Sequence, residues 1–312
     1  MNAPKPSFSV HVDVTNPGQF FACCGLLELA HRLWPGTEGW FEEEEGIFSV
    51  CTSDPSTTLQ RLFDDLRKCE ICGLSEKDRK ERNDLEKEKR RLRRERKELS
   101  EEKEQRRKDL GTMARKGAIF LGSPFFLALD WWQTGDEDPA TPKTWAGLQE
   151  IHRVARAAQD ALSGIQSLEA CLDHSCVLRP SMEYRKKKSD EKNKVEPFYF
   201  DARRFAHALD MGFSLDAQEA ETEAHPVAEL LCLIGLQRFM PARYSPGPGK
   251  ADWEFAYSIW LQPLPVLTAA AVANTAVPTS FSRRYGFRRV FRDDQKRLKA
   301  FSFATPIIGG EP

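Results

Sequence analysis

The sequence predicts an α+β protein: a mixed body of antiparallel strands and buried helices with a long charged helical arm inserted. Two observations lead to this class. Short segments of alternating apolar side chains are mixed with longer segments of helical spacing, without the regular strand–helix–strand order of a parallel sheet. Charge is also uneven along the 312 residues, because 28 of the 35 residues in 76–110 are charged. The rest of the chain has the charge content of an ordinary globular protein.

The amino-terminal part, residues 1–70, begins with a predicted strand and a predicted helix. Apolar and polar side chains alternate from Phe8 to Val14, which is typical of a half-buried strand. Asn16 is then a helix cap and Pro17 a first helical residue, with Gln19 spaced to complete the cap. The helix is apolar on nearly all sides and is expected in the core until Trp34–Gly36 stops it. A strand and a further helix are predicted at 47–51 and 59–66.

Residues 76–110 contain no glycine or proline and have the composition of a helix. Leu85, Leu92 and Leu99 lie seven residues apart and form a single apolar seam, whereas a stable coiled coil has two apolar positions per heptad. A continuous helix would be about 50 Å long. We expect this arm to be partly frayed or docked on a partner.

The remaining part, residues 117–312, continues the α+β body. Its predicted strands are at 125–132, 198–200 and 253–259, and its predicted helices are at 144–165 and 225–239. The segments 281–292 and 296–303 are predicted to form a carboxy-terminal β-hairpin.

Composition excludes several classes of protein. No segment approaches the ~20 apolar residues of a membrane span, and the first residues lack a signal-peptide pattern. We therefore expect a cytoplasmic protein without a membrane partner, whose eight cysteines are reduced thiols. The sequence also lacks a phosphate loop, a dinucleotide fingerprint, a nucleophile elbow and a metalloprotease helix, so we nominate no catalytic residue.

The carboxy-terminal hairpin is the strongest candidate for binding. Residues 281–300 contain eight basic and two acidic side chains, although the whole chain has 46 basic and 47 acidic residues. Alternation predicts one face with arginines and the other with Tyr285, Phe287 and Phe291. Such a surface suits a phosphate backbone, and a solvated basic edge strand is the alternative. The candidate nucleic-acid contacts are Arg283, Arg284, Arg288, Arg289 and Arg292.

Two smaller basic segments are further candidates. Lys186, Lys187 and Lys188 lie in a loop that could clamp a backbone, or that only solubilises the surface. Arg203 and Arg204 follow the aromatic strand at 198–200, where Arg203 could instead pair with a neighbouring aspartate.

Four cysteines are the only candidate metal ligands. Cys69 and Cys72 have the spacing of half a zinc site, and Cys171 and Cys176 form a second pair. The alternative is that they are buried small apolar residues. No cofactor other than zinc is expected.

Three segments together resemble the large-subunit family of type I-G (formerly I-U) CRISPR effector complexes: VDVTNPGQFFACCGLLEL at 12–29, FYFDARR at 198–204 and ALDMGFS at 208–214. The resemblance implies a non-catalytic subunit of a Cascade ribonucleoprotein. Its expected partners are the CRISPR backbone and guide-end subunits, guide RNA, target double-stranded DNA and a helicase-nuclease. Its expected role is recognition of the protospacer-adjacent motif, with Asn16 as a candidate reader of base edges.

Two other functions remain open. A guide-RNA-binding or RNA-processing subunit would need a histidine or tyrosine beside the ribose, for which His207 and Tyr285 are the candidates. A structural adaptor would use the helical arm as its main partner surface.

Overall fold

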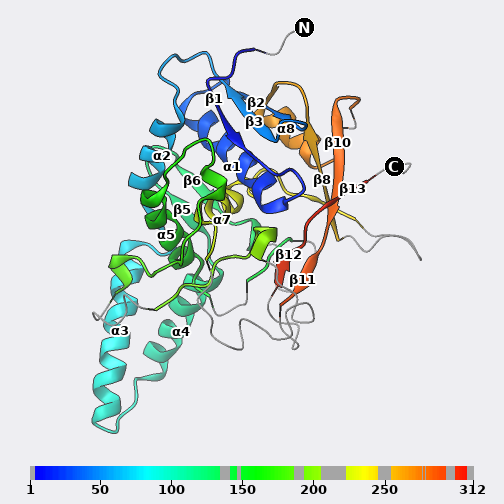
Figure 1. Ribbon diagram of the computed structural model, residues 1–312. Coiled ribbons are helices and arrows are strands. Elements are labelled where there is room, and N and C mark those ends of the chain that lie inside the picture. The colour runs from blue at the N-terminus through cyan, green and yellow to red at the C-terminus, as the bar shows by residue number, and fades with distance from the viewer. Residues whose placement is uncertain are drawn as a thin grey trace, which may run out of the picture.

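The computed structural model describes residues 4–133, 141–145, 149–185, 193–204, 223–244, 254–275, 277, 279–292 and 299–307. It has a mixed α+β fold with antiparallel sheets (Figure 1). Its helices are α1 (Pro17–Leu33), α2 (Leu59–Lys68), α3 (Glu76–Arg94), α4 (Glu101–Lys116), α5 (Ile151–Ala161), α7 (Pro226–Gly235) and α8 (Val266–Ala273). Within the described ranges, none of these helices is both long and apolar enough to cross a membrane.

The strands form four sheets. The first has the order β1-β3-β2-β9, the second β13-β10-β8-β7, the third β4-β5-β6, and the last pairs β11 with β12. Their bounds are β1 (Phe8–His11), β2 (Glu38–Glu42), β3 (Ile47–Cys51), β4 (Ile71–Cys72), β5 (Ile119–Leu121), β6 (Leu127–Leu129), β7 (Ala242–Arg243), β8 (Phe255–Trp260), β9 (Leu264–Pro265), β10 (Ser282–Phe287), β11 (Arg289–Phe291), β12 (Lys299–Phe301) and β13 (Thr305–Pro306).

Two buried helices, α1 and α7, pack against each other in the middle of the body (Figure 1). The predicted cap of α1 is confirmed, since the Asn16 side chain accepts a hydrogen bond from the Gly18 N–H and Pro17 opens the helix. Gln19 does not complete this cap; its Oε1 accepts from the backbone N–H of Asp13 at 2.6 Å. Local cap chemistry therefore starts the helix where the sequence predicts it.

Aromatic side chains join α1 to both four-stranded sheets. The Phe20 ring stacks on Tyr257 of β8, with centroids 4.2 Å apart, and on Phe41 of β2 at 5.4 Å. The indole N–H of Trp260 donates to the carbonyl oxygen of Gly39 at 2.6 Å. The amino- and carboxy-terminal parts of the chain therefore share one hydrophobic core.

Three predicted elements differ in the structure. The strand at 125–132 is limited to β6, and the helix at 144–165 is limited to α5 and a following 3-10 turn. The aromatic segment 198–200 is not a strand, because Tyr199 has a left-handed backbone with φ of 64°. Phe198 and Phe200 are nevertheless fully buried.

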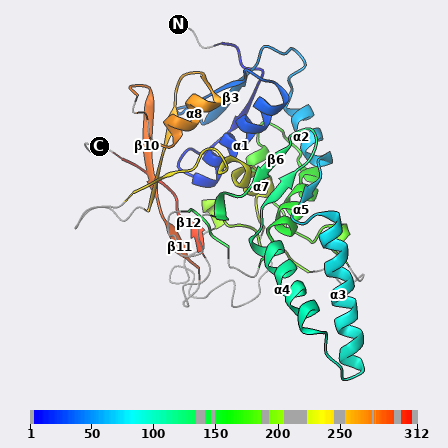
Figure 2. The ribbon, with the colours of Figure 1, turned by 180° about the vertical axis from the view of Figure 1, so that it is seen from behind.

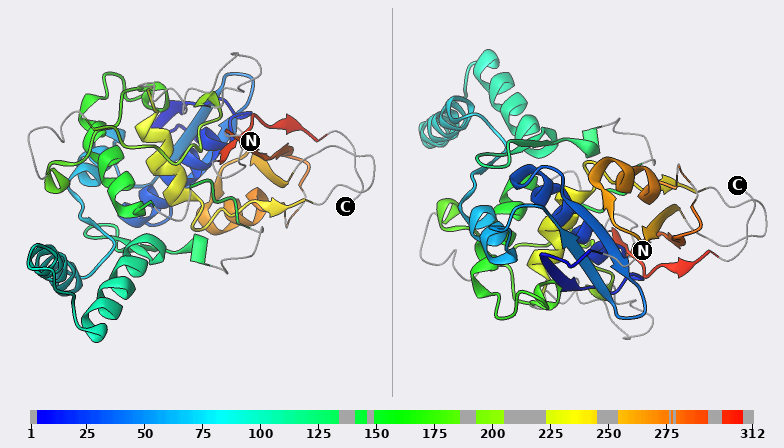
Figure 3. Two further views of the ribbon diagram at one scale, coloured as in Figure 1. Left: turned by 90° about the horizontal axis from the view of Figure 1, so that it is seen from below. Right: turned by 90° about the horizontal axis from the view of Figure 1, so that it is seen from above.

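The charged segment folds as a helical hairpin of α3 and α4, which extends away from the body (Figures 2 and 3). The segment is not one continuous helix, because the chain turns back after Arg94 and Arg96 adopts φ of 57°. Ion pairs link the two helices: Arg106 contacts Asp78 and Glu81, each at 2.8 Å. The leucine seam offers too few apolar contacts to stabilise a long isolated helix. Ion pairs between the two antiparallel helices therefore add to the stability of this segment.

Candidate nucleic-acid interface

The basic carboxy-terminal strands pair differently from the predicted hairpin. β11 does pair with β12, but β10 lies between β8 and β13. Tyr285 stands opposite Tyr257, and Phe287 opposite Phe255. Cross-strand aromatic pairs of this kind hold a register, so β10 belongs to the central sheet. The residues that join the two predicted hairpin strands, 293–295, lie outside the described residues.

The faces of these strands agree with the prediction only in part. Tyr285 and Phe287 are buried as expected, but Phe291 is 43% exposed. The cause lies at Arg288, between β10 and β11, where the chain changes its partner strand. Arg288 exchanges hydrogen bonds with Ser302, whose backbone N–H donates to the Arg288 carbonyl at 3.0 Å. The alternation therefore does not continue from β10 into β11.

Two of the predicted arginines lie over tyrosine rings. The guanidinium carbon of Arg284 lies 5.6 Å from the centre of the Tyr244 ring, and that of Arg292 lies 3.2 Å from the centre of the Tyr199 ring. A guanidinium over an aromatic ring makes a cation–π contact, while its terminal N–H groups can still donate to phosphate oxygens. Arg288 is exposed. These three positions suit contact with an anionic backbone.

The remaining two arginines of the hairpin have carboxylate partners. Arg283 is 56% exposed and lies 3.9 Å from a carboxylate oxygen of Glu43. Arg289 is only 7% exposed, donates to both carboxylate oxygens of Glu254 at 2.9 and 3.0 Å, and donates to the carbonyl of Thr141. Burial would raise the pKa of Glu254, but the bonds from Arg289 outweigh it and lower that pKa. Arg289 is a structural ion-pair residue, and its assignment to the binding surface is wrong.

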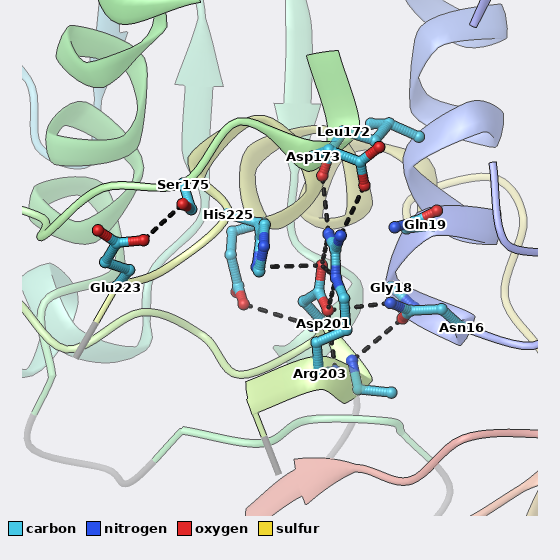
Figure 4. Close-up of polar contacts among 12 residues, drawn as sticks. Asn16, Gly18, Gln19, Leu172, Asp173, Ser175, Asp201, Arg203, Glu223 and His225 are labelled. Atoms are coloured by element: carbon cyan, nitrogen blue, oxygen red, sulfur yellow. Dashed lines mark hydrogen bonds and ion pairs between the residues drawn. The ribbon is translucent and has the colours of Figure 1, made fainter. Parts of the chain in front are cut away.

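Asn16 is also engaged inside the protein (Figure 4). It is completely buried, and its Nδ2 donates to Asp201 at 2.9 Å. Its Oδ1 accepts from the backbone N–H groups of Gly18 and Ala202. A side chain committed in this way cannot reach a base edge, so the prediction of base reading by Asn16 is wrong.

Arg203 belongs to the same cluster, in which Asp201 is the centre (Figure 4). Its guanidinium contacts Asp201 at 2.7 Å and Asp173 at 2.6 Å, and His225 Nδ1 lies 3.5 Å from Asp201. Burial acts to raise the pKa of Asp201, yet the hydrogen bonds and positive charge of Arg203 and the charge of His225 lower it overall. The alternative role of Arg203, pairing with aspartate, is the one observed.

Gly18 explains why this cluster is so compact. A Cβ built on Gly18 would lie 2.4 Å from the carbonyl oxygen of Phe200, so only glycine permits the approach of the two backbones. The segments 12–29 and 198–204, which are two of the three segments with the family resemblance, therefore meet around Asp201.

Several predicted positions lie outside the described residues. These are the whole of Lys186, Lys187 and Lys188, and the side chain of Arg204, whose backbone ends a short 3-10 helix. His207 also lies outside the described residues. Tyr285, the other candidate for RNA processing, donates its hydroxyl to Glu43, and burial together with this bond raises the pKa of Tyr285. The Tyr285 hydroxyl is therefore already engaged in a hydrogen bond within the protein.

The described structure does not bring the four predicted zinc ligands together in one group. Across the described ranges, which include all four, no group of three or more histidine, cysteine or acidic side chains is arranged to hold a metal ion. Cys69 and Cys171 are each 1% exposed, and burial raises the pKa of Cys69 to about 11 and that of Cys171 to about 12. Protonated, buried thiols pack as small apolar groups, which is the alternative to a zinc site.

The structure contains one basic region that the sequence analysis does not predict. From the sequence, the charged segment is expected only to be a partly frayed or partner-bound arm. At the end of the helical hairpin, a cavity of about 500 Å³ is lined by Lys89, Arg93, Arg96 and Lys97, together with two glutamates. The sequence does carry a signal for it, since residues 89–97 contain seven basic side chains and one acidic side chain.

Comparison with known proteins gave no match to a family model, to a curated protein or to a solved structure.

Proposed function

We propose that this chain is a non-catalytic, nucleic-acid-binding subunit of a type I CRISPR interference ribonucleoprotein in the cytoplasm. In this role it recognises the protospacer-adjacent motif and target DNA, and recruits the helicase-nuclease. The observation that carries the proposal is the set Arg284, Arg288 and Arg292, in and beside β10 and β11, of which two lie over tyrosine rings and one is exposed. The resemblance of the segments around Asp201 supports the kind of assembly.

These arginines suit contact with the phosphate backbone of a nucleic acid. Arginines whose planes are held by aromatic rings lose little side-chain entropy when they bind, because their orientation is already restricted. Each guanidinium that neutralises a phosphate also releases condensed counterions, so binding must weaken as salt rises. In an RNA-guided complex such contacts position the duplex, while base pairing with the guide reads the sequence.

The first experiment compares the complex reconstituted with and without this chain. Binding is measured on matched duplexes that differ only in the few base pairs flanking the target. We expect discrimination between flanks only when the chain is present. Equal binding of every duplex by both complexes would show that the chain does not recognise the motif.

A second experiment tests the arginines. The triple variant Arg284→Gln, Arg288→Gln and Arg292→Gln should reduce the magnitude of the log–log salt slope by about 0.9 for each phosphate that the variant no longer neutralises. The matched control is Arg61→Gln, because Arg61 of α2 also stacks on a ring, that of Trp34, at 5.7 Å. A triple variant with the slope of the wild-type protein would contradict this assignment.

The adaptor function is favoured by one observation, the helical hairpin that extends from the body (Figure 1). β4 and β5 are antiparallel neighbours, with Ile71 opposite Leu121, so a short Gly-Ser loop can replace residues 74–117. If the chain is an adaptor, this variant fails to join the complex. If the chain is a DNA-binding subunit, the variant still assembles and the complex still discriminates between flanks.

A further inference from the structure

A second cavity, of about 360 Å³, lies where the base of the helical hairpin meets α5. This volume lies within the range of small-ligand sites. Figures 1 and 2 show α3 and α5 side by side at this point, on the side of the body away from β10. The cavity is lined by Arg79, Arg82 and Arg90 of α3, by His152 and Arg153 of α5, and by Tyr184.

The wall of this cavity carries more positive than negative charge. Among the described residues that line it, Glu86 is the only acidic one, and its carboxylate already pairs with Arg107 of α4 at 2.7 Å. Glu150, at the start of α5, pairs with both Arg82 and Arg153. One carboxylate therefore holds two guanidiniums in place and cannot neutralise both.

Arg90 adds a further charge at the rim. It is exposed and forms no ion pair with any residue that the structure describes. On the opposite wall, the guanidinium of Arg153 lies 5.0 Å from the centre of the Tyr184 ring. This cation–π contact holds Arg153 beside the cavity.

A buried histidine in the wall of the cavity has one polar atom without a hydrogen bond. His152 is 7% exposed, and its Nδ1 is buried without a hydrogen-bond partner among the described residues. A Cβ built on Gly73, which also lines the cavity, would lie 2.8 Å from this atom. Buried polar atoms are nearly always hydrogen-bonded, so this unpaired nitrogen beside the cavity is an exception.

We propose that this cavity binds a phosphate group. Several guanidiniums that converge from two helices provide the charge and the bidentate donors that phosphate oxygens accept. The phosphate belongs either to the backbone of a nucleic acid or to a free nucleotide, and both present the same oxygens. The inference does not depend on the function proposed for β10, because the two sites lie on different sides of the body.

The test uses the full chain with the double variant Arg79→Gln and Arg90→Gln. These two positions avoid the Glu150 network, since loss of Arg82 or Arg153 would leave a carboxylate that is 13% exposed with too little compensation. Arg91→Gln is the matched control: it removes the same kind of charge from the same helix, at a residue that is 69% exposed and does not line the cavity. Thermal melting confirms that all variants fold.

Equilibrium binding is measured with inorganic phosphate, with AMP and with a twelve-nucleotide single-stranded RNA. We expect the double variant to weaken binding at least tenfold, while Arg91→Gln binds like the wild-type protein. Weaker binding of phosphate or AMP identifies a free ligand, and weaker binding of the RNA alone identifies a phosphodiester. Equal affinities of the wild-type protein and the double variant, equal weakening in both variants, or no binding by the wild-type protein would each overturn the proposal.

The triple variant Arg284→Gln, Arg288→Gln and Arg292→Gln is measured in parallel. If it weakens RNA binding and the double variant weakens the binding of none of the three ligands, the cavity proposal fails while the proposed function stands. If only the double variant weakens binding, the cavity is supported and the assignment of Arg284, Arg288 and Arg292 is contradicted.

Discussion

The contact between α1 and α7 makes a quantitative prediction for Gly25→Ala. A Cβ built on Gly25 would lie 2.0 Å from the carbonyl oxygen of Leu231, and one built on Gly235 would lie 2.0 Å from that of Phe21. Ordinary contact begins at 3.4 Å, so the helices would have to separate by about 1.4 Å. Because the neighbour is backbone in a filled core, it cannot turn aside as a side chain can.

Alanine is favoured over glycine within a helix by about 1 kcal/mol, but this gain is smaller than the cost of separating the two helices. Overpacking a core typically costs about 1–3 kcal/mol, occasionally more, and a clash with backbone lies at or above the upper end. We therefore expect Gly25→Ala to lower the free energy of unfolding by about 2–3 kcal/mol after the helical gain is included.

Gly111→Ala is the matched control for this prediction. Gly111 lies within α4, and the nearest atom to its added Cβ is a terminal nitrogen of Arg115 at 3.4 Å. The same substitution should here stabilise the protein by about 0.5–1 kcal/mol. Urea unfolding followed by tryptophan fluorescence measures both variants. If Gly25→Ala were as stable as the wild-type protein, the close packing of α1 on α7 would be refuted.

Three further predictions concern buried charges and thiols. Asp201→Asn should cost about 3 kcal/mol at pH 7, because it breaks a buried pair with Arg203. The pKa of Asp201 is lowered in the folded state, so the ionised carboxylate stabilises the folded protein at neutral pH. This stabilisation disappears as the pH falls below about 4. The free energy of unfolding of the variant should therefore decline less steeply in acid than that of the wild-type protein. Arg289→Ala should cost about 2 kcal/mol because its bonds to Glu254 are removed, whereas Arg288→Ala should change stability by less than about 0.5 kcal/mol in the same urea assay. EDTA should leave the Tm unchanged, and a fall in Tm would restore the zinc hypothesis.

Local signals predict several elements correctly. The helix at 17–33 starts where a capping side chain and a proline stand together, and the strand at 47–51 is found with the predicted bounds. Both depend on interactions within a few residues of the chain. The sequence gives 76–110 a helical composition but does not predict the pairing of α3 with α4, because the ion pairs between these helices join residues 15 to 28 positions apart.

The roles of the candidate site residues are harder to predict from the sequence than the helices and strands are. The sequence identifies Asn16 as a cap, but its bond to Asp201 spans 185 positions, and only that contact removes it from a binding surface. The phosphate cavity is not predicted at all, since it needs α3 and α5 to meet. The alternating charges of the segment give no indication of which arginines face a cavity.

Arg288 and Arg289 show most clearly what the sequence determines and what only the tertiary structure determines. The amino-acid sequence by itself determined that this carboxy-terminal region is basic and interleaved with aromatic residues, because composition and alternation are properties of the chain. The tertiary structure alone decided that Arg289 is buried against Glu254 while its neighbour Arg288 is exposed. The physical reason is that the role of a charged side chain depends on the solvent and countercharges around it, and folding brings those together from distant parts of the chain.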